Sequence, residues 1–231
     1  ETTHLRVAVG ADGFATGLFD RGTGKQYCDL SRPRPFMTAT VDGVSYPPAA
    51  LSQEAGCIRA DFGGIGVRAV VEVENREDYV VLTVSELSGP DVEAFGFINL
   101  QPTIADHIGP WLNIAWNDTF GVCAIALNNQ AHCQAELQEE WRLQARCYDQ
   151  FGLVGARAAL IGGPPSEIRA IIERVERREG LAHPVLGGTW AKDSEEAKRS
   201  YLFVDLTEGN VDQVIEYAVA AGRRQVLTYV G

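Results

Sequence analysis

Two carboxylates, Asp205 and Glu208, lie at the end of and just after a predicted strand, the short apolar run at residues 200–206. A pair of carboxyl groups can supply a proton donor together with a nucleophile or a general base. This segment also fits a simpler purpose, because Asn210 is a favourable N-cap for the helical apolar spacing that begins there. The sequence therefore predicts Asp205 and Glu208 as candidate catalytic residues, with helix capping as the alternative.

His107 is a second candidate, because it follows Asp106 in a predicted loop that leads to Trp111. Imidazole titrates near neutral pH, so a histidine beside a carboxylate can act as a general acid or base. An indole next to it could stack on the face of a sugar ring. We therefore expect His107 and Trp111 to be candidate substrate-binding residues. A histidine that only satisfies a loop hydrogen bond is the alternative.

Tryptophan occurs four times, at positions 111, 116, 141 and 190. An indole buries about 150–250 Å² when it is packed, so a place in the core is the default for each. Trp190 is a further candidate for substrate binding, because it lies in a glycine-rich stretch near a predicted domain boundary. Trp111 and Trp116 are five positions apart. One strand would place them on opposite faces, so at most one of them could line a cleft.

The composition argues against several kinds of partner. A net charge of −11 without clustered lysines and arginines argues against nucleic acid. No run approaches about 20 apolar residues, so we expect no membrane span. The five cysteines include no C-x-x-C pair, which favours buried thiols over a zinc site or a full disulfide framework. No phosphate-binding, EF-hand or H-E-x-x-H motif appears, so we expect neither a metal nor another cofactor.

Strand-like segments dominate residues 5–161. About ten short apolar or alternating runs are separated by turn signals such as Asp42-Gly43. The spacing of these turns is typical of an antiparallel β-sandwich. The sequence therefore predicts a mainly β fold for this region.

The pattern changes after the last of these strands. Residues 164–180 predict a helix with Ser166 as its N-cap. The final segment reads as strand, helix and strand, a βαβ unit that buries both faces only when further units follow. We therefore expect a sandwich at residues 1–162 and a linker with a helix at 163–199. Residues 200–231 would be the first, incomplete βαβ unit of a truncated TIM barrel.

Three stretches carry a resemblance to a known group of proteins. They are GLFDRGTGK at residues 17–25, NLQPTI at 99–104 and FGLVGARAALIG at 151–162. Followed by a helix and a barrel start, they resemble the N-terminal half of large bacterial carbohydrate-active enzymes. In those enzymes a galactose-mutarotase-like β-supersandwich precedes the TIM barrel of a glycoside hydrolase.

The resemblance implies a function and a place for its chemistry. It implies a secreted or periplasmic polysaccharide-degrading enzyme whose partners are an oligo- or polysaccharide and the rest of its own barrel. Barrel active sites lie at the carboxyl ends of the strands, where Asp205 and Glu208 would stand. The principal catalytic acids would then lie on later strands, so this region alone would be inactive.

Two other functions stay open. The chain could be a non-catalytic carbohydrate-binding or structural sandwich module. It could also be a mutarotase-like sugar epimerase, which would use a histidine and a glutamate on a concave face. His107, His132, Glu139 and Glu140 are candidates for that pair by residue type alone.

Overall fold

The computed structural model describes residues 1–54, 56–104, 106–109, 112–136, 141–197, 201–223 and 225–228. The chain divides into two compact units, Glu1–Leu181 and Ala182–Gly231. Strands make up most of the regular structure of the first unit, and only two α-helices are found among the described residues. The chain is therefore mainly β, as predicted.

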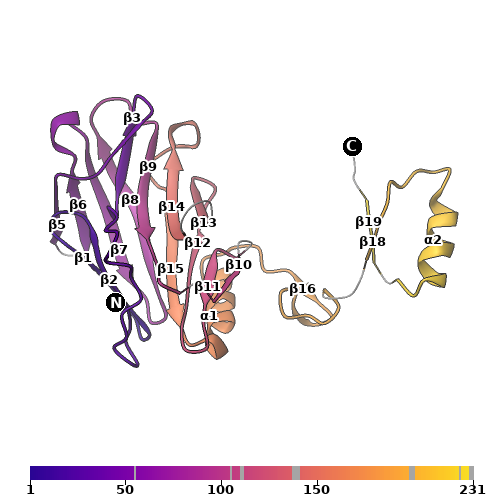
Figure 1. Ribbon diagram of the computed structural model, residues 1–231. Helices are drawn as coiled ribbons and strands as arrows, with labels where there is room; N and C mark the ends of the chain where they lie inside the picture. The colour runs from indigo at the N-terminus through magenta and orange to yellow at the C-terminus, as the bar shows by residue number, and fades with distance from the viewer. Residues whose placement is uncertain are drawn as a thin grey trace. The chain divides into compact units, whose positions relative to one another are not determined.

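Two antiparallel sheets form the first unit (Figure 1). Among the described residues, the larger sheet has eight strands, in the order β10 (His107–Gly109), β11 (Ile114–Trp116), β12 (Gly121–Ala126), β15 (Arg157–Gly163), β8 (Tyr79–Ser88), β7 (Arg68–Asn75), β6 (Cys57–Asp61) and β5 (Ala50–Glu54). The smaller sheet has five, in the order β13 (Ala131–Glu136), β14 (Arg142–Tyr148), β9 (Ala94–Leu100), β3 (Thr38–Val41) and β4 (Val44–Tyr46). Besides helix α1, the unit also contains the hairpin of β1 (Leu5–Val9) and β2 (Ala15–Asp20) and the short 3₁₀ helices η1 (Gly63–Ile65) and η2 (Asp149–Phe151).

The core lies between the two sheets. Side chains two positions apart on a strand reach the same face, and β8 buries Leu82 and Val84 in this way while β9 buries Phe95 and Phe97. Phe62, directly after β6 of the larger sheet, meets Phe95 of the smaller sheet edge to face, with ring centroids 6.0 Å apart. This packing confirms the predicted sandwich.

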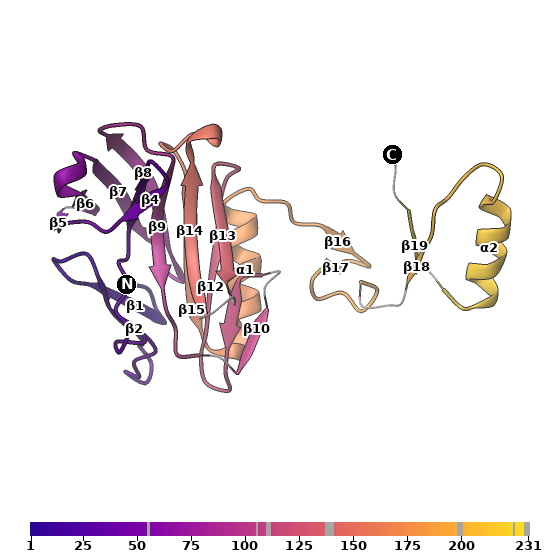
Figure 2. The same cartoon turned by 45° about the horizontal axis from the view of Figure 1, so that its top comes forward.

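Helix α1 (Pro165–Arg178) packs against β12 and β15, and Figure 2 shows it lying along these strands. Four apolar side chains at helical spacing are buried: Ile168, Ile171, Ile172 and Val175. On β15, Leu160 belongs to the core between the sheets, whereas its neighbour Ile161 is buried outside that core. The helix therefore covers the outer face of the larger sheet and belongs to the first unit.

The ends of α1 differ in part from the sequence prediction. The N-cap position is Pro164, and no side chain caps the helix, so the prediction of Ser166 as N-cap was wrong. The first helical residue is Pro165. Proline fits this position because it has no N–H to satisfy and its φ is already helical. At the other end Gly180 adopts a φ of 71°, which terminates the helix as predicted.

The second unit contains two small sheets among its described residues. Strands β16 (Val185–Leu186) and β17 (Thr189–Trp190) form a hairpin whose two turn residues, Gly187 and Gly188, both have positive φ. Strands β18 (Tyr201–Phe203) and β19 (Gln225–Leu227) pair in parallel and are joined by α2 (Val211–Ala220). The predicted strand, helix and strand are therefore observed as a βαβ unit with its own sheet.

Candidate functional site

The candidate carboxylates lie beside the carboxyl ends of β18 and β19. Because the two strands run in parallel, their carboxyl ends share one edge of the sheet. The Leu206 N–H donates a 3.2 Å hydrogen bond to Thr228 Oγ1, which joins the segments that leave the two strands. Asp205 and Glu208 lie in the loop that begins at this edge. The barrel and their catalytic role stay predictions.

Asn210 holds this loop in shape. Its Oδ1 accepts a 2.7 Å hydrogen bond from the Thr207 N–H, and its Nδ2 donates a 2.9 Å hydrogen bond to the Asp205 carbonyl. Asn210 occupies the N-cap position of α2, but its side chain bonds the preceding loop and not the first helical turn. Asp205 and Glu208 are exposed, and within the described chain their carboxylates have no hydrogen-bond or ion-pair partner. Both are open to a ligand.

His107 lies in an aromatic pair. It is directly opposite Trp116 across β10 and β11, and the two rings stack with centroids 5.2 Å apart and an interplanar angle of 28°. Trp111, the aromatic neighbour expected from the sequence, lies outside the described residues. Trp116 was missed as a partner because the contact depends on the register of this hairpin. Its position on the same predicted strand as Trp111 was the only sequence signal.

Trp190 is packed within its own unit. Trp190 is only 3% exposed. The His183 ring stacks on its indole, with ring centroids 6.0 Å apart and an interplanar angle of 2°. The ammonium nitrogen of Lys192 lies 5.1 Å from the indole centroid. A sugar ring could stack on Trp190 only after one of these neighbours moved.

The residues considered for an epimerase do not form a pair in the described part of the chain. His132 is exposed on the edge strand β13, and Glu139 and Glu140 lie outside the described residues. Among described contacts, neither His107 nor His132 has an ion pair with a glutamate. The described residues therefore do not provide the histidine–glutamate pair that the epimerase hypothesis needs.

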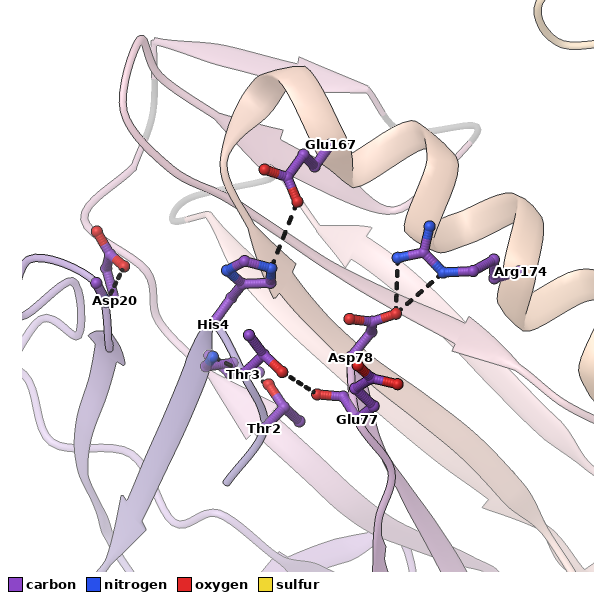
Figure 3. A network of polar contacts seen from close by, with 10 residues as sticks. Thr2, Thr3, His4, Asp20, Glu77, Asp78, Glu167 and Arg174 are labelled. Carbon is purple, nitrogen blue, oxygen red and sulfur yellow. Dashed lines mark hydrogen bonds and ion pairs between the residues drawn. The ribbon is translucent and has the colours of Figure 1, made fainter.

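Another set of charged groups joins the N-terminal strand and α1 to the β7–β8 turn (Figure 3). His4 Nε2 lies 3.6 Å from Glu167 Oε2 on α1. Arg174, also on α1, donates two hydrogen bonds to Asp78 Oδ2, at 2.6 and 3.0 Å. These pairs link elements that are far apart in the sequence, so we assign them a structural role.

The described residues contain neither a metal-binding cluster nor an activated cysteine. No group of three or more His, Cys, Asp or Glu side chains could hold a metal ion there. All five cysteines are free thiols, and burial raises the pKa of Cys133 and of Cys147 to about 12. A thiol with such a pKa is a poor nucleophile near neutral pH. None of the described helices has both the length and the apolar character that a bilayer crossing needs.

No family model and no curated protein matches this sequence. Among solved structures, the chain is similar to alpha-N-acetylgalactosaminidase NagBb from Bifidobacterium bifidum in its GalNAc complex, with a TM-score of 0.54. The identity is 8%, and the match covers 99% of this chain and 50% of that chain. This likeness shows the fold alone. The chain has a fold like that of part of a bacterial glycoside hydrolase and spans half the length of that enzyme's chain.

Proposed function

We propose that this chain is the N-terminal region of a polysaccharide-degrading glycoside hydrolase. Residues 1–162 are its galactose-mutarotase-like sandwich with α1 packed on it, the residues from 182 to 199 lead onward, and 200–231 begin a (β/α) barrel that holds the main catalytic groups. The enzyme acts on glycans in a secreted or periplasmic form. Fold similarity to a glycoside hydrolase along nearly the whole chain supports this proposal.

The observation that carries the proposal is an exposed apolar face of the β18–β19 sheet. On α2, which joins the two strands, Val214 and Ala218 are buried. Tyr201, Phe203 and Leu227 are 55%, 51% and 45% exposed. Tyr201 and Phe203 lie two apart on one strand, and Leu227 pairs with Phe203, so the three share one face. Parallel sheets are covered on both faces, and the remaining strands of a barrel would supply that cover.

If residues 200–231 begin a barrel, the loop after β18 has a chemical role. Barrel enzymes assemble their sites at the carboxyl ends of the strands. Glycosidic cleavage uses one carboxyl group to protonate the leaving oxygen and another as nucleophile or base. Asp205 and Glu208 would contact substrate at the rim of the cleft, while acids on later strands would cleave the bond. The Asn210 hydrogen bonds would keep this loop in one conformation.

The test is a comparison of two lengths of the protein. A longer product of the same gene and the 231-residue chain are assayed with a panel of aryl glycosides that includes an aryl α-N-acetylgalactosaminide. We expect the longer protein to release the aryl alcohol and the shorter chain to release none. A longer protein that cleaves no member of the panel, or a short chain that cleaves as fast, would contradict the proposal.

Substitutions in the longer protein test the rim. We expect Asp205→Asn and Glu208→Gln each to lower kcat/KM by about 10- to 100-fold, because a lost substrate contact weakens transition-state binding. Glu216→Gln is the matched control, since Glu216 is an exposed carboxylate on α2 outside this edge. Equal effects of all three substitutions would show that Asp205 and Glu208 do not contact the substrate.

Two other outcomes would favour the alternative functions. Glycan binding without bond cleavage would favour the non-catalytic module, and sugar anomerisation followed by polarimetry would favour the epimerase.

A further inference from the structure

A hollow of about 330 Å³ lies in the first unit, where β12 leads into β13 and β14 leads into η2. It is lined chiefly by aromatic and amide side chains, namely Asn129, Gln130, His132, Tyr148, Gln150 and Phe151. None of the residues that line it carries a fixed charge. A second hollow of similar volume, beside β1, differs because the carboxylates Glu1 and Glu54 are among its lining residues.

Three rings border the hollow between β13 and η2. Phe151 is 58% exposed. Tyr148 is partly buried, and its ring centroid lies 6.4 Å from that of the exposed His132 at an angle of 38°. The hollow therefore offers flat apolar faces to solvent.

The backbone around the hollow is held by side-chain amides. Asn128 Nδ2 donates a 2.7 Å hydrogen bond to the Gly155 carbonyl, and Gln130 Nε2 donates a 3.0 Å hydrogen bond to the Val154 carbonyl. Gly152 has a φ of 88°, and a Cβ there would lie 2.7 Å from Gln130 Nε2. These contacts preform the wall, which lowers the entropy cost of binding a ligand.

Two more amides face solvent without internal partners. Asn129 and Gln150 are exposed, and in the described chain their side-chain amides make no hydrogen bond. Each amide offers donors and an acceptor, which is the complement of neighbouring hydroxyl groups. Flat apolar faces, open amides and the lack of fixed charge together match an uncharged, hydroxyl-rich ring. We propose that this hollow binds one neutral sugar residue of a glycan.

The choice of a glycan rests in part on the proposed function, but the site belongs to the first unit and needs no barrel. The test is an NMR titration of the 231-residue chain with galactose, glucose, mannose, N-acetylglucosamine and N-acetylgalactosamine. We expect saturable binding of at least one sugar, with shifts centred on the amides of residues 129–132 and 148–152. Phe151→Ala should weaken that binding by about tenfold, and Gln150→Ala by about threefold or more.

Tyr217→Ala is the matched control, because Tyr217 is an aromatic residue on α2 that is 62% exposed. It should leave sugar affinity unchanged. The spectrum of Phe151→Ala reports whether the variant is folded, and Gln150→Ala provides a second probe if it is not. The absence of binding by all five sugars, or equal binding by Phe151→Ala and the parent chain, would overturn the inference.

The outcome is separable from that of the proposed function. If the longer protein hydrolyses no glycoside while the short chain still binds sugar through Phe151, the inference stands and the proposed function fails. If hydrolysis is found while Phe151→Ala binds sugar normally, the proposed function stands and the inference fails.

Discussion

Tyr79 donates a 2.6 Å hydrogen bond from its hydroxyl to Glu179 Oε1. The same carboxylate accepts a 3.0 Å hydrogen bond from Arg157 Nη2, and its side chain is only 6% exposed. Tyr79 begins β8, Arg157 begins β15, and Glu179 is the C-cap of α1. One buried carboxylate thus joins the helix to two strands of the larger sheet. Burial raises the pKa of Tyr79 to about 12, and the hydrogen bond to Glu179 and its charge act in the same direction.

This relationship predicts a loss of stability in alkali. An unfolded tyrosine has a pKa of about 10, so the unfolded chain loses this proton before the folded chain does as pH rises. The contribution of Tyr79 to the free energy of unfolding is therefore fully present below about pH 10 and falls between about pH 10 and 12. Urea unfolding across this range should show a shallower decline for Tyr79→Phe. Tyr217→Phe, at an exposed site, should follow the parent chain, and identical curves for Tyr79→Phe and the parent would refute the assignment.

The contact between α1 and the sheet predicts the effect of a single methyl group. Gly121 pairs with Gly163 across β12 and β15, and a Cβ on Gly121 would lie 2.8 Å from Ile168 Cδ1 and 3.3 Å from Trp116 Cβ. We expect Gly121→Ala to lower the free energy of unfolding by about 1–3 kcal/mol, because a packed core resists added volume. Gly64→Ala is the control, since a Cβ there meets nothing within 4 Å. Chemical denaturation measures both, and equal stabilities would contradict the close approach.

The thiols predict a pattern of chemical labelling. Cys57 is partly exposed, whereas Cys28, Cys123, Cys133 and Cys147 are buried. In the native protein at neutral pH, a water-soluble thiol reagent should modify Cys57 first and the others only after unfolding. Mass spectrometry of partly labelled protein identifies the site, and Cys57→Ser should remove the fast phase. Rapid native labelling of Cys133 or Cys147 would show that the sheets open far more often than this packing allows.

The Asn210 contacts predict a local change in dynamics at the proposed barrel rim. Asn210→Ala removes both hydrogen bonds to the loop, so the Thr207 amide should exchange with solvent several-fold faster. Asn210→Asp keeps an oxygen for Thr207 but has no donor for the Asp205 carbonyl. We therefore expect near-native exchange at Thr207 in Asn210→Asp. Unchanged exchange in Asn210→Ala would mean that the backbone alone holds the loop.

Much of the fold was predictable because its signals are local. Alternating apolar runs such as β8 and turn pairs such as Asp42-Gly43 predicted an antiparallel sandwich. The helical spacing of apolar residues predicted α1 and α2. The parallel pairing of β18 and β19 also followed from the order of strand, helix and strand. Each of these features depends on residues within one short window of the chain.

The candidate site was predictable only in its residue types. The sequence by itself determined that Asp205 and Glu208 follow a strand and that aromatic residues accompany His107. Only the tertiary structure decided that His107 stacks on Trp116, that Trp190 is buried, and that α1 lies on the sandwich. These outcomes depend on strand register and on packing between distant segments, and many sequences with the same local pattern could meet differently.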